Sequence, residues 1–200
     1  MTSRIYMIRH GITEGNRNGW FYGSTDLSLT EEGKEQLAQL AMDGYYPVLS
    51  DEALFITTGL ARTKETLEII YGPRESLAVP ELQEMNFGNY ECFRFDEIKD
   101  DPFFSKWLED EEGEVKLPGG ESRQEFYERV SKGREILLKL SEEKEEIFLA
   151  CHGGVIAQLL HQMFPEMKDS MWEWLPEPAK GYVVEIVESR PERVLSLEDI

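Results

Sequence analysis

The sequence predicts an α/β fold, specifically a three-layer α/β/α sandwich around a mostly parallel sheet. Short apolar runs alternate with segments whose apolar residues recur at helical spacing, which is typical of a parallel sheet covered by helices. Several runs end in polar residues followed by glycine, as strands do where they reach a turn. The 200 residues, 40% of them hydrophobic, suffice for one core, so we expect a single domain over residues 1–200.

The first half of the chain contains three of the predicted strands. A helix is expected to begin near Thr30, because Glu31 and Glu32 then occupy its first turn, where acidic groups suit the helix dipole. We expect the third strand to lie at the sheet edge, since Pro80 has no N–H to donate to a neighbour. The elements are strands at residues 5–8, 53–56 and 77–82, a loop containing Gly15, Gly19 and Gly23, and helices over about 30–41 and 60–71.

The second half of the chain opens with a segment of different composition. Residues 86–120 are rich in aromatic and acidic residues, and we interpret them as a small helical and aromatic insertion that folds over the functional site. Ser122 and Glu125 form a capping-box pattern that begins a long amphipathic helix. The remaining elements are a strand at 147–151, a helix to about 164, and a hairpin of 182–187 and 194–197 around Arg190-Pro191.

The charge of the chain excludes two classes of partner. Twenty-one basic and 40 acidic residues give a formal net charge of −19, which repels nucleic acid and anionic lipid surfaces. Residues 147–165 carry no charged side chain, but polar residues and glycines interrupt them, so a buried strand and core helix explain them better than a membrane span. Two cysteines cannot build a disulfide framework, and we expect a cytoplasmic protein.

Polar side chains follow three of the predicted strands at the point where each strand ends. Arg9 and His10 follow the first, Thr58 and then Arg62 follow the second, and His152 follows the fourth. Ligands of such sheets bind beyond the carboxyl ends of the strands, so we expect these groups to converge on a tetrahedral dianion. Helices that begin at Gly59 and Gly153 are expected to direct backbone N–H groups at the same anion.

Five motifs occur in a fixed order along most of the chain. They are Arg9-His10-Gly11 with Thr13-Glu14-Gly15-Asn16, Thr58-Gly59-Leu60-Ala61-Arg62, Leu82-Gln83-Glu84 with Phe87-Gly88 and Glu91, Pro118-Gly119-Gly120-Glu121-Ser122, and His152-Gly153-Gly154. Together they resemble the phosphatase branch of the histidine phosphatase superfamily, the phosphoglycerate mutase-like family. Cys92 stands where the family's acid motif usually ends in glycine, so the entry to the insertion is expected to differ in shape.

The resemblance implies a role for each matching residue. His10 is the nucleophile and becomes phosphohistidine, Glu84 donates a proton to the leaving oxygen and later activates water, and Arg9, Arg62 and His152 hold the phosphoryl group. Asn16, Thr58 and Gly153 are implied to contact the substrate. The implied fold is phosphoglycerate mutase-like, with no metal and no cofactor.

The chemistry of a phosphate monoester explains why these residue types belong together. The ester resists attack because its oxygens are negative, and two permanently cationic arginines neutralise that charge without reorganising. The same positive charge disfavours an imidazolium, so we expect His10 to be neutral and nucleophilic near pH 7. Cys151 is not expected to be a nucleophile, since strand alternation directs it away from His152.

Three functions remain open at this point. The first is hydrolysis of a small-molecule phosphate monoester, and the second is a phosphoglycerate mutase of the same family. A mutase must retain a bisphosphate, and the net charge of −10 over residues 81–147, where 20 acids face 10 bases, disfavours that ligand. The third is a non-catalytic protein that binds a phosphorylated ligand, although no residue of the catalytic pattern is missing. The particular substrate and the oligomeric state do not follow from the sequence.

Overall fold

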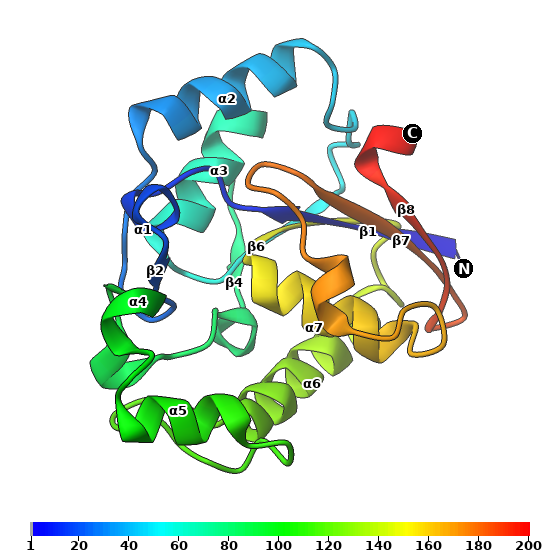
Figure 1. The fold of residues 1–200 in the computed structure, drawn as a ribbon. Helices are drawn as coiled ribbons and strands as arrows, with labels where there is room; N and C mark the ends of the chain where they lie inside the picture. Colours follow the sequence, from blue (N-terminus) through cyan, green and yellow to red (C-terminus); the bar gives the residue numbers. More distant parts are fainter. Residues whose placement is uncertain (1) are drawn as a thin grey trace.

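The computed structural model describes residues 2–200, and its centre is a six-stranded sheet with the strand order β4-β3-β6-β1-β7-β8 (Figure 1). Strands β4, β3, β6 and β1 are parallel, and β7 runs antiparallel to both β1 and β8. The sheet is therefore mostly parallel, as the sequence predicts. The strands are β1 (Thr2–Arg9), β3 (Leu54–Thr57), β4 (Leu77–Ala78), β6 (Glu146–Cys151), β7 (Gly181–Val187) and β8 (Arg190–Ser196).

Helices cover both faces of this sheet because the central strands are apolar on both sides. Along β1, Ile5 and Met7 pack into one hydrophobic core, while Tyr6 and Ile8 pack into the other. Figure 1 shows α2 and α3 on one side of the sheet and α6 and α7 on the opposite side. The prediction of a three-layer sandwich is confirmed. The helices are α2 (Glu31–Met42), α3 (Ala61–Tyr71), α6 (Arg123–Leu140) and α7 (Gly153–Met163).

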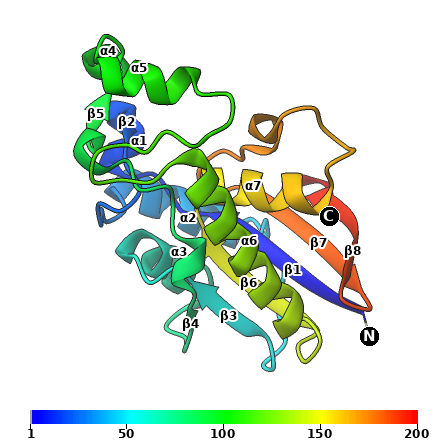
Figure 2. The ribbon, with the colours of Figure 1, turned by 90° about the horizontal axis from the view of Figure 1, so that it is seen from below.

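The segment that the sequence singles out as an insertion lies at one end of the sheet. Figure 2 shows α4, α5 and the small β2–β5 sheet grouped at the carboxyl end of β1, away from the N-terminus. Aromatic side chains fill this region, with Phe104 in contact distance of the rings of Phe21, Tyr90 and Trp107. The elements here are β2 (Trp20–Phe21), η2 (Gly88–Tyr90), β5 (Phe93–Arg94), α4 (Phe95–Ile98) and α5 (Pro102–Glu109).

Three local predictions require correction. The loop after β1 contains a short helix, α1 (Glu14–Asn18), which Thr13 caps. The strand expected over 77–82 ends at Ala78, and Pro80 begins the 3₁₀ helix η1 (Pro80–Leu82), where its missing N–H costs nothing. The edge position of this strand is correct.

The third correction concerns the terminal hairpin. The turn is formed by Glu188 and Ser189, which have φ angles of 50° and 63°, and not by Arg190-Pro191. Positive φ at both central residues is the geometry of a two-residue turn that matches strand twist. Pro191 lies within β8, where a missing N–H is tolerated because β8 is an edge strand. Helical turns η3 (Met171–Trp174) and η4 (Leu197–Asp199) flank the hairpin.

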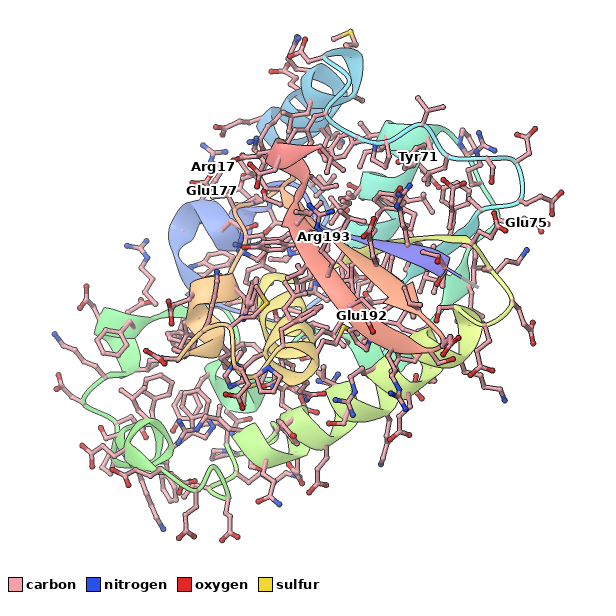
Figure 3. The ribbon with its side chains drawn as sticks, turned by 90° about the vertical axis from the view of Figure 1, so that its right-hand side faces the viewer. Arg17, Tyr71, Glu75, Glu177, Glu192 and Arg193 are labelled. Atoms are coloured by element: carbon pink, nitrogen blue, oxygen red, sulfur yellow. The ribbon has the colours of Figure 1, made fainter. Side chains whose placement is uncertain are left out.

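The exposed edge strand carries charged side chains. Figure 3 views the molecule from the side of β8 and labels Glu192 and Arg193 on this strand. Both residues are exposed. Among residues 2–200, no helix has the length and apolar character that crossing a membrane requires.

Candidate active site

A cavity of about 400 Å³ lies where the central strands meet the insertion. Its walls combine the polar residues predicted from the strand ends with a large apolar surface. The polar residues include Arg9, His10, Asn16, Arg62 and Glu84, and the aromatic ones include Trp20, Phe21, Phe87, Trp107, Phe126 and Trp172. The cavity is thus a small cationic end joined to an aromatic chamber.

The tautomer of His10 follows from one hydrogen bond. Its Nδ1 lies 2.7 Å from the carbonyl oxygen of Gly11, and since a carbonyl only accepts, Nδ1 must carry the proton. Nε2 therefore keeps its lone pair. Burial, and then the charge of the Arg62 guanidinium, hold the pKa of His10 well below its usual value. A buried ring that stays neutral and presents one free nitrogen is suited to nucleophilic attack.

His152 lies beside His10, with the two ring centroids 5.3 Å apart and the planes inclined at 65°. Its Nδ1 accepts a hydrogen bond from Nε of Arg62 at 3.3 Å, so its Nε2 carries the proton and donates to Thr58 Oγ1 at 2.9 Å. Burial, and then the charge of Arg62, lower the pKa of His152 well below its usual value. The two imidazoles and Arg62 therefore form one contiguous group.

Arg62 is held by the loop that follows β2. Its Nη1 donates to the carbonyl of Thr25 at 3.0 Å and its Nη2 donates to the carbonyl of Gly23 at 2.7 Å. The ring of Tyr22 lies 5.1 Å from the guanidinium carbon. Because all three nitrogens are bonded and the side chain is fully buried, the guanidinium has a fixed position in the cavity wall.

Arg9 supplies a second guanidinium next to the start of α7. Its Nη1 donates to the carbonyl of Pro176 at 2.7 Å, while its buried Nε has no hydrogen-bond partner in the structure. A Cβ on Gly153 would lie 3.1 Å from both Nε and Cζ of Arg9. Gly153 thus allows the close approach, and the Nε–H of Arg9 has no acceptor from the protein.

Glu84 is anchored by two backbone donors. The N–H of Gly154 donates to Oε2 at 2.9 Å, and the N–H of Met85 donates to Oε1 at 3.0 Å. The first bond ties the carboxyl group to the first turn of α7, immediately after His152. The side chain expected to exchange protons is therefore fixed at the same end of the cavity as His10.

Two of the residues implied to contact substrate have structural partners. Thr58 is fully buried and lies behind His152 rather than on the cavity wall. Asn16 does line the cavity, but its Oδ1 accepts hydrogen bonds from Thr13 and from the hydroxyl of Tyr22 at 3.0 Å. Its amide nitrogen remains the group that can bind a ligand.

Helix α7 begins at Gly153 as expected, whereas the expected helix start at Gly59 needs correction. Helix α3 begins at Ala61, and the N–H of Ala61 donates to Asp26 at 2.7 Å. At α7, the N–H of Gly154 donates to Glu84. The protein's own carboxylates therefore occupy both of these donors, because an exposed N–H at a helix start attracts the nearest anion.

The contacts of Glu91 do not follow from its sequence motif. Its carboxylate accepts hydrogen bonds from the N–H groups of Gly23, Ser24, Thr25 and Phe87 at 2.9 to 3.1 Å. The carbonyls of this same loop hold Arg62. The match of Glu91 to the acid motif marks it as a residue of interest, but the motif does not indicate which loop Glu91 binds.

Comparison with known proteins agrees with this geometry. A family model for the histidine phosphatase superfamily (branch 1) matches residues 5–199. The chain belongs to the histidine phosphatase superfamily. The predictions of this family and of a phosphoric monoester hydrolase are confirmed at that level.

The similar proteins carry two kinds of name. An adenosylcobalamin/alpha-ribazole phosphatase of Escherichia coli (strain K12) is 29% identical over 177 residues, covering 86% of this chain and 84% of the relative. A 2,3-bisphosphoglycerate-dependent phosphoglycerate mutase of Parvibaculum lavamentivorans is 27% identical, covering 82% and 80%. The crystal structure of the alpha-ribazole phosphatase from Shigella flexneri is similar with a TM-score of 0.82 and 26% identity, covering 96% of this chain and 95% of that chain.

Within residues 2–200, no group of three or more His, Cys, Asp or Glu side chains is arranged to hold a metal ion. The charged groups that line the cavity beside His10 are the guanidiniums of Arg9 and Arg62 and the carboxyl group of Glu84.

Proposed function

We propose that this histidine phosphatase hydrolyses a small-molecule phosphate monoester, without a metal, through a phosphohistidine formed on His10. The observation that carries the proposal is the tautomer of His10. Its Nδ1–H is committed to Gly11, so Nε2 holds the lone pair, in a cavity wall that also contains Arg9 and Arg62. Arg9, Arg62 and Glu84 line the same cavity, which supports the roles that the family resemblance implies for them, whereas His152 and Thr58 lie outside its wall.

The first step transfers the phosphoryl group to the enzyme. Nε2 of His10 attacks phosphorus in line with the leaving oxygen, so a P–N bond forms as the P–O bond to the organic part breaks. Arg9 and Arg62 neutralise the equatorial oxygens, whose charge the site must bind more strongly in the transition state. The leaving oxygen takes a proton from Glu84, a contribution of roughly 10²–10⁴-fold in rate.

The second step releases phosphate. Glu84, now a carboxylate, accepts a proton from a water molecule as that water attacks phosphorus, and the P–N bond breaks. Inorganic phosphate leaves with the oxygen of the water, and Nε2 regains its lone pair. Thr58 and His152 act behind the reacting atoms, where they fix the orientation of Arg62.

The aromatic chamber favours hydrolysis of an organic phosphate over retention of a bisphosphate. Apolar side chains such as Phe21, Phe87 and Trp107 dominate the wall beyond the phosphate end. Burial of a flat organic group against such rings is favourable, whereas a second phosphate finds only one further guanidinium, that of Arg123, in this wall. Because two similar proteins carry the name alpha-ribazole phosphatase, alpha-ribazole 5′-phosphate is one candidate substrate.

The proposal is tested by a phosphate-release screen over sugar phosphates, nucleotides, phosphoglycerates and alpha-ribazole 5′-phosphate. We expect His10→Ala to lose turnover and acid-labile labelling from a ³²P-substrate, because no other side chain has the nucleophile's place. His161→Ala, in α7 and outside the cavity wall, is the matched control and keeps both. Turnover that survives His10→Ala contradicts the proposal. Efficient interconversion of phosphoglycerates with little phosphate release indicates the mutase instead.

A further inference from the structure

A third arginine in the cavity wall has no role in the steps above. Arg123 is the first residue of α6, and it lines both the catalytic cavity and a neighbouring surface hollow. Its Nε and Nη2 are buried and have no hydrogen-bond partner, and no carboxylate of residues 2–200 lies within 4.0 Å of it. The Arg123 side chain is half-buried, and two of its donors lack acceptors, so a group that supplies those acceptors binds there favourably.

The two unpaired nitrogens define the shape of that group. Nε–H and the adjacent Nη2–H point the same way from one edge of the guanidinium and match two oxygens of a carboxylate. The protein contains this arrangement elsewhere, since Nε and Nη2 of Arg129 each donate at 2.7 Å to the two carboxylate oxygens of Glu121. In Arg123 the same edge has no hydrogen-bond acceptor from the protein.

Two neighbours make this part of the wall a built site. Gln158 of α7 is only 5% exposed, lines the cavity beside Arg123, and makes no side-chain hydrogen bond within residues 2–200. The ring of Trp107 lies 5.8 Å from the guanidinium carbon of Arg123 and supports it from the insertion. Arg123 and Gln158 thus offer donors for an anion next to the aromatic ring of Trp107.

We propose that Arg123, with Gln158, determines specificity by binding a carboxylate on the organic part of the substrate. The substrate class is then a phosphate monoester whose leaving group is flat and apolar and bears a carboxylate away from the ester oxygen. This inference rests on the proposed function. Arg9 and Arg62 bind the phosphoryl group beside His10. Arg123 lies on a different element, α6, where it binds the part of the substrate that is remote from phosphorus.

The experiment compares phenyl phosphate with 3- and 4-carboxyphenyl phosphate, whose carboxylates lie at two distances from phosphorus. For the wild-type enzyme, we expect kcat/KM for one carboxylated ester to exceed that for phenyl phosphate by about 10- to 100-fold, the value of a charge-assisted hydrogen-bonded pair. In Arg123→Leu this ratio falls to about one, mainly through KM. Arg123→Lys keeps the positive charge but lacks the paired Nε–H and Nη2–H donors, so we expect an intermediate ratio of the two kcat/KM values.

Arg74→Leu removes an equal charge from an exposed site outside the cavity and is expected to keep the wild-type ratio. A wild-type ratio near one for both isomers overturns the inference, whether or not the variants fold. So does a ratio that survives Arg123→Leu. In both results phosphate is still released, so the proposed function stands. Release of no phosphate from any monoester, these three included, overturns the proposed function together with the inference.

Discussion

The two imidazoles of the site bind a proton much less readily in the folded protein than in the unfolded chain. Burial and the adjacent charge of Arg62 lower the pKa of both His10 and His152 well below 6.5. Below pH 6.5 these two imidazoles bind protons in the unfolded chain but stay neutral in the folded protein. Folding therefore becomes less favourable as the pH falls. The stability from these groups is fully present above the ordinary histidine pKa and is lost in acid.

This linkage gives a measurable slope. Between pH 7 and about pH 5.5 we expect the free energy of unfolding to fall by about 1 kcal/mol for each histidine. Urea titrations at the two pH values measure the fall. His152→Asn removes one of the two groups, so its stability changes by about half as much over the same interval. Equal stability of the wild-type protein at both pH values contradicts the neutral state of these rings.

Glu91 is linked to Arg62 through a loop. Its carboxylate holds the N–H groups of Gly23, Ser24 and Thr25, whose carbonyl side fixes Arg62. A Cβ on Gly23 would collide with the carbonyl oxygen of Met85, so the loop is also packed directly against the chain next to Glu84. Glu91 is therefore a positioning residue for the arginine.

We expect Glu91→Gln to lower kcat/KM at least tenfold and to weaken inhibition by inorganic phosphate to a similar degree, because the amide satisfies fewer of the four donors. Steady-state kinetics with phosphate as inhibitor separate this from a loss of stability alone. Glu68→Gln, an exposed residue of α3, is the matched control and is expected to behave as wild type. An unchanged phosphate inhibition constant in a folded Glu91→Gln protein would show that the loop holds Arg62 without help.

At the scale of elements, α6 begins where its sequence pattern predicts. Ser122 Oγ accepts from the N–H of Glu125 at 3.0 Å, and the Glu125 carboxylate accepts from the N–H of Ser122 at 3.0 Å. Because Arg123 is the next residue, this cap also fixes the start of the segment that carries it. The capping box thus links a local sequence rule to the wall of the cavity.

Removing the cap has a defined cost. Ser122→Ala is expected to lower the free energy of unfolding by about 1 kcal/mol, since a helix donor loses its acceptor. Ser122→Thr keeps the oxygen and is expected to remain within about 0.5 kcal/mol of wild type. Chemical denaturation of the three proteins provides the comparison, and equal midpoints for all three would mean that water replaces the serine.

At the scale of the molecule, the sheet has one long edge strand, β8. β8 spans seven residues and has no partner on its outer side among residues 2–200, and the exposed Glu192 and Arg193 lie along it (Figure 3). Charged side chains on an edge strand oppose pairing with a second sheet. The double variant Glu192→Val, Arg193→Val is therefore expected to self-associate, visible as concentration-dependent elution in size-exclusion chromatography. Elution identical to wild type at high concentration would assign the protection to another feature.

The sequence predicts the layers and the convergence of His10, Arg62 and His152 because each follows a strand in a parallel sheet. Periodicity decides which elements form, and topology then brings their carboxyl ends together. The partners of Thr58 and Glu91 are not predictable in this way, since they depend on loop conformation. The prediction of the hairpin turn is wrong for a different reason. Proline is common in turns, but Pro191 lies in the edge strand, and Glu188 and Ser189 adopt the left-handed conformation of the turn.

The hydrogen bond between His10 and the carbonyl of Gly11 has a consequence for the proposed phosphohistidine. Since Nδ1 is protonated throughout, the ring needs neither a flip nor a change of tautomer between formation and breakdown of the P–N bond. In the proposed mechanism, phosphorylation is confined to Nε2, the nitrogen remote from the main chain. The trapped adduct should consequently be the tele isomer of the modified residue, a regiochemistry that ³¹P–¹⁵N coupling distinguishes from the pros form.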